Sequence, residues 1–180
     1  AVLHVRDDAE HRLKRLRDVL SRADRTLTEA RAARVEVLSK ILASEVPAVS
    51  GPATTLHEQL AAAEEFARGA QWHRLSPLLD GLEEHADEEL LRARDSLTAV
   101  TAPLAVRAEL RGRLDAYRAK TARLGMAEDP LIIERYDQAR RLLWTAPCDL
   151  AAAERAVQRY QQAVAEIGTP RTPTDRAESG

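Results

Sequence analysis

The chain has few aromatic residues and little glycine, and this scarcity bears first on its fold class. Of its 180 residues, 3% are Phe, Trp or Tyr and seven are glycine, whereas 44% are hydrophobic. β-Sheets favour aromatic and β-branched side chains, while the abundant Ala, Leu, Arg and Glu favour helices. The hydrophobic fraction is too high for a disordered chain. The composition therefore predicts an all-α protein.

The sequence also lacks a second cysteine, an excess of positive charge and a long apolar run. Cys148 is the only cysteine, which excludes an intramolecular disulfide and is compatible with a reducing cytoplasm. The formal net charge of −2 leads us to expect no nucleic-acid partner. The longest uncharged run, residues 96–106, is too short for a membrane span and is interrupted by Pro103.

No pattern typical of a catalytic or cofactor site is found. There is no glycine-rich phosphate loop, Ser-His-Asp arrangement or dinucleotide fingerprint. Four histidines are scattered without the spacing of metal ligands: His4, His11, His57 and His73. We therefore expect no enzyme, no cofactor and no metal.

The first part of the chain carries a long heptad-like pattern. Small or apolar residues recur in steps of three and four, interrupted only at Arg34: Ala9, Leu13, Leu16, Leu20, Ala23, Leu27, Ala30, Val37 and Ile41. We name this set the α-seam. It predicts one long coiled-coil-like helix over residues 1–46, which either pairs with a second chain through residues 9–41 or forms the spine of a bundle.

The rest of the chain reads as an antiparallel helical bundle over residues 47–168, followed by a disordered tail over 169–180. With the first helix this gives about six helices, with predicted limits near 2–46, 55–75, 76–101, 103–124, 130–144 and 149–167. Ser76 and Pro77 predict one helix start. Proline after Thr101 predicts an end or kink, and Gly125 predicts a helix stop.

An acidic cluster surrounds His85 in residues 80–89, "DGLEEHADEE". Glu84 and Glu88 lie one helical turn apart, a spacing that could hold a divalent cation. Metal sites in bundles, however, need such ligands from several helices, and no second Glu-x-x-His is present. We therefore favour a solvated helix face that also pairs with basic residues elsewhere in the bundle.

An arginine stripe is predicted on the helix near 103–124. Arg107, Arg111 and Arg118 fall close to one face of that helix, where they could bind a carboxylate or phosphate. One alternative is intramolecular pairing with the acidic third helix, and the other is a partner protein. If a partner binds, we expect its docking surface to contain these arginines and the loop residues Trp144, Cys148 and Asp149.

Cys148 and the C-terminal tail are two further candidates for a functional role. Cys148 has no evident histidine partner, so a catalytic or redox role is not expected. In the tail, the candidate phosphoacceptors are Thr169, Thr172 and Thr174, and phosphate there could bind an arginine cluster. An inert tail is the alternative.

The N-terminal residues allow two interpretations. The stretch "AVLHVRD" is followed by four basic residues, as at the cytoplasmic exit of a membrane helix, so a membrane anchor upstream of Ala1 is one expectation. The other is a trimmed soluble protein. We expect a cytoplasmic location, in the first case at the inner face of the plasma membrane.

Two stretches, "APLAVRAELRGRLDAYRAKTARLGMAEDP" and "RRLLWTAPCDLAAAERAVQRYQ", resemble the C-terminal helical region of actinobacterial GlnX-type membrane proteins. The resemblance covers about residues 102–162. It implies a cytoplasmic, non-enzymatic signalling domain of a membrane sensor that relays amino-acid availability to a Ser/Thr kinase of the protein kinase G type. The alternative hypothesis is a structural coiled-coil dimerisation module without a regulated partner.

Overall fold

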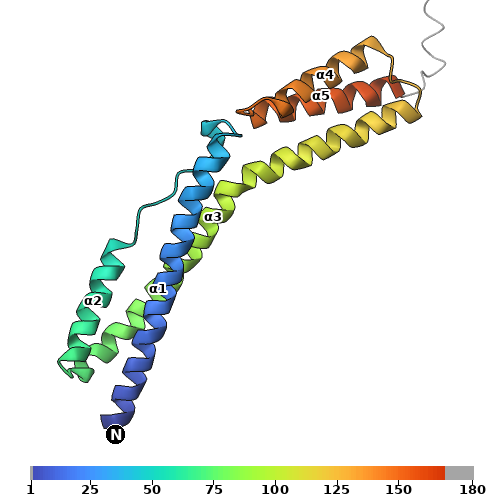
Figure 1. The fold of residues 1–180 in the computed structure, drawn as a ribbon. Coiled ribbons are helices and arrows are strands. Elements are labelled where there is room, and N and C mark those ends of the chain that lie inside the picture. The colour runs from blue at the N-terminus through green and yellow to red at the C-terminus, as the bar shows by residue number, and fades with distance from the viewer. Residues whose placement is uncertain (1, 169–180) are drawn as a thin grey trace, which may run out of the picture. The chain divides into compact units, whose positions relative to one another are not determined.

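The computed structural model describes residues 2–168 and confirms an all-α fold over that range (Figure 1). Its only β-type pairing there is an isolated bridge between Ile41 and Cys148. The helices are α1 (Val2–Leu38), the short 3₁₀ helix η1 (Ala43–Glu45), α2 (Thr54–Arg68), α3 (Trp72–Arg123), α4 (Pro130–Trp144) and α5 (Leu150–Gly168).

The predicted break at residues 101–103 is wrong, because α3 continues through it. This is why the described chain has five α-helices where about six were expected. Pro103 removes one helical hydrogen bond, at a cost of roughly 3 kcal/mol. The hydroxyl of Thr101 meanwhile donates to the carbonyls of Leu97 (3.0 Å) and Thr98 (3.2 Å). Helix-favouring alanine and leucine on both sides allow the helix to absorb the lost bond.

The start of α3 was also predicted too late. The second helix ends at Arg68 rather than near residue 75, and α3 begins at Trp72 rather than at Ser76. The turn between them places Ala70 in the left-handed region, with φ 54°, and the amide of Gln71 donates to the carbonyl of Phe66 (2.9 Å). Alanine rarely adopts this conformation, so the sequence gives no sign of the turn.

The described chain forms two compact units, whose limits differ from the predicted division at residue 46. Unit 1 contains residues up to 36 and 47–101, and unit 2 contains residues 37–46 and those from 102 onward. Helix α3 contributes to both. The units are described separately below.

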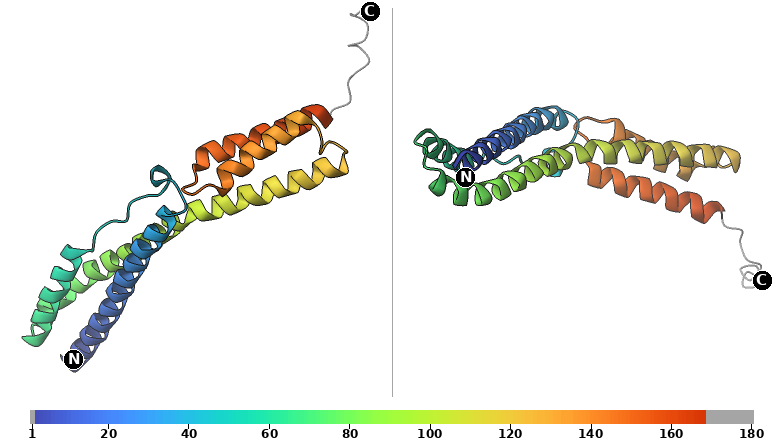
Figure 2. Two further views of the ribbon diagram at one scale, coloured as in Figure 1. Left: turned by 45° about the horizontal axis from the view of Figure 1, so that its top comes forward. Right: turned by 90° about the horizontal axis from the view of Figure 1, so that it is seen from below.

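Unit 1 is built from α1, α2 and the first part of α3, which lie side by side (Figures 1 and 2). The α-seam residues of unit 1, from Ala9 to Ala30, are all buried, as the heptad pattern predicts, and so are Val37 and Ile41 of unit 2. The α-seam leucines at 13, 16 and 20 share one core cluster with residues of α2 and α3, among them Leu60 and Leu79. The apolar stripe of α1 is thus covered within the chain by its own neighbouring helices.

Unit 2 packs α4 and α5 along the last part of α3 (Figure 1). Buried Leu114, Leu143 and Tyr160 contribute to its core, and the ring of Tyr160 meets that of Tyr136 edge-on at 5.8 Å between centroids. On the last part of α3, Leu110 and Leu114 are buried, whereas Val106 (40% exposed) and Leu124 (53% exposed), just past the end of the helix, are not.

The turn from α3 to α4 follows the sequence prediction. Gly125 stops the helix with φ 71°. The carboxylate of Asp129 caps α4 by accepting from the amides of Leu131 (2.9 Å) and Ile132 (3.3 Å), with Pro130 at the first helical position. Within the range that the structure describes, no helix has the length and apolarity needed to cross a bilayer.

The core of unit 1 can be tested by a matched pair of substitutions on α3. Leu79 is fully buried whereas Leu91 is 59% exposed. Leu79→Ala should lower the free energy of unfolding by about 2–5 kcal/mol, because it leaves a cavity in a packed core. Leu91→Ala should change it by less than about 0.5 kcal/mol. Urea unfolding followed by circular dichroism measures both, and equal losses would contradict the core described here.

Candidate interaction site

Arg111 fastens α3 to the end of α4 within unit 2. Its guanidinium donates through Nε (3.1 Å) and NH2 (2.7 Å) to the carbonyl of Leu143, in the last turn of α4. The last four carbonyls of a helix have no partner within the helix, so this pair of bonds caps α4 from outside. The charge of Arg111 also opposes the negative end of the helix dipole. Burial, and then the charge of Arg107, lower the pKa of Arg111.

Two guanidinium groups contact the ring of Trp144. The guanidinium carbon of Arg111 is 4.6 Å from the indole centroid, and that of Arg140 is 5.0 Å away. Both distances fall in the range of cation–π contact. The indole nonetheless stays 42% exposed. It is therefore a large aromatic side chain held in place at the surface.

A shallow hollow of about 420 Å³ lies beside this stack. It is lined by Asp137, Arg140, Arg141, Trp144 and Thr145. We call this lining, together with Arg111, the Trp144 surface. Three of its members are arginines and one is a carboxylate, so the surface has a positive character. It also presents apolar area in the indole, and can thus form both ionic and apolar contacts with a partner.

Arg118 is occupied by a contact of its own. Its NH1 donates to the hydroxyl of Tyr136 (3.0 Å), and its guanidinium carbon lies 4.7 Å from the centroid of that ring. Arg111 and Arg118 therefore both bind α4 rather than the acidic cluster. Pairing of the arginine stripe with that cluster across a helical hairpin, the favoured intramolecular alternative, is wrong, because both lie on the single helix α3.

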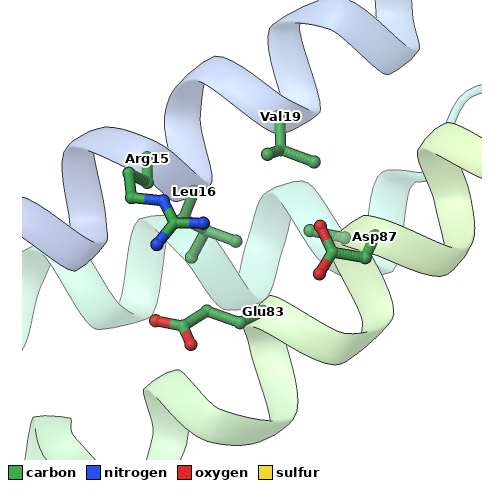
Figure 3. Close-up of a pocket in the computed structure, with 6 residues that line it drawn as sticks. Arg15, Leu16, Val19, Glu83 and Asp87 are labelled. Carbon is green, nitrogen blue, oxygen red and sulfur yellow. The ribbon is translucent and has the colours of Figure 1, made fainter.

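The acidic cluster instead faces α1 inside unit 1. Arg12 bonds the carboxylates of Glu83 (2.7 Å) and Asp80. Figure 3 shows a small pocket of unit 1, where Arg15 of α1 extends toward Glu83 of α3 and Asp87 also lines the pocket. The acidic cluster is thus paired in part with the basic residue Arg12 of the same unit. Among the described residues, no three His, Cys, Asp or Glu side chains gather where they could hold a metal ion.

The loop part of the predicted docking surface is mostly internal. Cys148 is fully buried, its thiol donates to the carbonyl of Leu142 (3.3 Å), and its backbone pairs with Lys40 and Leu42. The side chain of Asp149 accepts from the amide of Ala152 (3.1 Å) at the start of α5. Of these three predicted residues, Cys148 is buried, Asp149 is partly buried, and Trp144 is exposed.

The electrostatic surroundings of Cys148 act in opposite directions. Burial raises the pKa of the Cys148 thiol above its ordinary value, and Arg107 and Arg111 lower that pKa in part. Asp149 and Glu45 raise it again. Because burial is the largest effect, the group is a protonated, inert thiol near neutral pH.

Four residues of the Trp144 surface and one partner of the arginine stripe were missed from the sequence: Asp137, Arg140, Arg141, Thr145 and Tyr136. Of these, Arg140 had a readable signal. Arg140 and Trp144 are four residues apart, so they meet on one helix face. The role of Tyr136 as a partner of Arg118 depends on how α4 packs against α3, which no spacing reveals. The candidate phosphoacceptors Thr169, Thr172 and Thr174 lie outside the described residues.

Comparison with protein-family models, curated proteins and solved structures finds no match to the chain. The site is therefore interpreted from its own geometry.

The cap on α4 predicts that Arg111 matters for stability. Arg111→Ala should lower the free energy of unfolding by about 1–3 kcal/mol, since it leaves the Leu143 carbonyl without this partner and removes one face of the Trp144 stack. Arg111→Lys should recover only part of the loss, because an ammonium lacks the planar fork. Arg123→Ala, at an exposed position near the end of α3, is the control. Urea unfolding decides, and a loss no larger than that of the control would contradict the cap.

The burial of Cys148 predicts slow alkylation. In the folded protein at pH 8, iodoacetamide should modify Cys148 at least about 100-fold more slowly than in urea, because reaction requires local opening. Mass spectrometry over a time course measures the rate. Alkylation at the rate of the unfolded chain would contradict the buried, protonated thiol.

Proposed function

We propose that the protein is a non-enzymatic helical interaction domain that binds a protein partner through the Trp144 surface. The observation that carries this proposal is the exposed indole of Trp144, which is in cation–π contact with the guanidinium groups of Arg111 and Arg140. Tryptophan and arginine are the residue types that most often dominate the binding energy of protein interfaces. An exposed tryptophan can be buried by a partner and contribute strongly to the binding free energy.

The stack also reduces the entropy that a partner must overcome. A free arginine or tryptophan side chain loses rotamer freedom when it is fixed in an interface, at about 0.5–1.5 kcal/mol each. Here Arg111 is already held by its two bonds to the carbonyl of Leu143, and Trp144 by two cation–π contacts. The surface is thus organised before a partner arrives.

The proposed partner is a cytoplasmic Ser/Thr kinase, and the proposed setting is a membrane-associated sensor of amino acids. These two points rest on the resemblance of residues 102–162 to the GlnX-type proteins. That stretch includes the last part of α3, all of α4 and the Trp144 surface. The resemblance and the exposed Trp144 therefore both support unit 2 as the proposed place of partner binding.

The alternative, dimerisation through residues 9–41, would have to compete with contacts inside the chain. The α-seam residues of unit 1 already pack against α2 and α3. A partner helix on the same stripe would have to displace them and expose Leu60 and Leu79. A coiled coil thus requires unit 1 to open, which makes it the second proposal.

Binding to a purified candidate kinase tests the proposal by calorimetry. Arg140→Glu and Trp144→Ala should each weaken binding by about tenfold or more, as expected for central interface residues. These positions are preferable to Arg111 and Arg118, whose contacts also stabilise the fold. Arg155→Glu, an exposed position on α5, makes the same charge change away from the surface and should bind like the wild type.

Circular dichroism verifies that each variant is folded, and light scattering reports the oligomeric state. Wild-type affinity in both Arg140→Glu and Trp144→Ala would reject the Trp144 surface. A stable dimer in the absence of the kinase that is lost on Leu16→Arg would favour the coiled-coil proposal instead.

A further inference from the structure

We infer that the Trp144 surface recognises an acidic segment of its partner, in which carboxylate side chains bind Arg140 and Arg141. This inference rests on the proposed function and adds the chemistry of the partner to it. The fold leaves hydrogen-bonding capacity unused at this site, and the groups around it carry a net positive charge.

The unused capacity lies on the two arginines of the last turns of α4. Among the described residues, no carboxylate or carbonyl accepts a hydrogen bond from the guanidinium of Arg140 or Arg141, and both side chains are exposed. Arg111 and Arg118, by contrast, each have an acceptor within unit 2. Each guanidinium carries five N–H donors in a planar fork that matches a carboxylate. The fold therefore leaves two such forks free.

The orientation of Arg140 favours a carboxylate as the ligand. Its guanidinium lies over the indole of Trp144, 5.0 Å from the centroid. Stacking engages the face of the guanidinium and leaves the N–H groups at its edge available. An anionic group can thus bind in the plane of Arg140 without displacing the aromatic contact. The indole in turn offers apolar area to the methylene groups of a Glu side chain.

Two features of the site oppose an anion, and the structure offsets one of them. A helix C-terminus carries partial negative charge, but the carbonyl of Leu143 is capped by the cationic Arg111. Asp137 remains as a carboxylate in the hollow, three residues before Arg140 and four before Arg141. The site has three arginines and one carboxylate, so its net charge is positive. Removing the charge of Asp137 should therefore strengthen the binding of an anion.

A second copy of this chain is the main competing occupant. Glu84, Asp87 and Glu88 on the first part of α3 are exposed, and no basic side chain of the described residues pairs with them. A head-to-tail contact between copies would produce rings or open assemblies, in which every copy but a terminal one has this site filled. We favour a separate partner because such an assembly would occupy the site permanently.

The test uses the full chain carrying Trp72→Phe, which leaves Trp144 as the only indole. A short synthetic peptide of alternating Glu and Ser is titrated while the fluorescence of Trp144 is followed. We expect saturable binding that weakens about tenfold for Arg140→Glu/Arg141→Glu and strengthens for Asp137→Asn. A peptide of alternating Gln and Ser should not bind.

The control for non-specific attraction is Arg155→Glu/Arg159→Glu, which makes the same change of net charge on the exposed side of α5. An equal loss in this control, or no saturable binding by the wild type, would overturn the inference. Self-association through this site would also overturn it. In light scattering, the molecular mass of the wild type would then rise with concentration, and that of Arg140→Glu/Arg141→Glu would stay at the mass of one chain. Tighter binding of a phosphoserine peptide than of the Glu peptide would also contradict a carboxylate partner.

The inference and the proposed function can fail separately. If the kinase binds through Trp144 but the acidic peptide does not bind, the interaction domain stands and the chemistry of its partner is different. If the peptide binds as expected but kinase affinity is unchanged in Trp144→Ala, the acidic site stands and the proposed partner is wrong.

Discussion

Covering a narrow apolar stripe with small side chains is the constraint on which unit 1 depends. The stripe of α1 consists largely of alanine and leucine, and the chain has few aromatic residues with which to fill space. Fully buried alanines such as Ala30, Ala63 and Ala93 permit close approach of neighbouring helix backbones. Stability must then come from many small contacts over long helices. The length of α1 and α3 follows from that need, since short helices of this composition would bury too little apolar area.

Unit 2 has a different constraint: a guanidinium packed against its helices needs a hydrogen-bond or aromatic partner, because burying a charge without one is costly. The structure directs Arg111 to a helix-terminal carbonyl and Arg118 to a tyrosine hydroxyl and ring. Both groups are thereby satisfied without an acidic residue. The same contacts hold Trp144 and Tyr136 in fixed positions. The surface that we propose for partner binding is thus a consequence of how α4 is attached to α3.

The sequence predicted what periodicity controls and missed what individual contacts control. The burial of the α-seam, the stop at Gly125 and the start of a helix near residue 130 all depend on local pattern, and the structure has them where expected. The helix through Pro103 and the turn at Ala70 do not, because a strong helix can absorb one lost hydrogen bond and alanine gives no warning of a left-handed turn. For the site, spacing identified the arginine stripe, but the partner of each arginine depends on how three helices pack.

The continuity of α3 has a consequence for charge that the sequence alone hides. The sequence suggests that the six carboxylates of residues 80–89 would pair with the arginine stripe across a turn. No such turn exists, because both lie on the continuous helix α3. Arg12 of α1 forms ion pairs with two carboxylates of the acidic cluster. Arg111 and Arg118 bind polar and aromatic groups of α4. Residues 102–168 then hold eleven basic and nine acidic residues, with Arg140 and Arg141 free of acceptors in the described structure. The acidic partner that we propose would supply the carboxylates that Arg140 and Arg141 lack within the described chain.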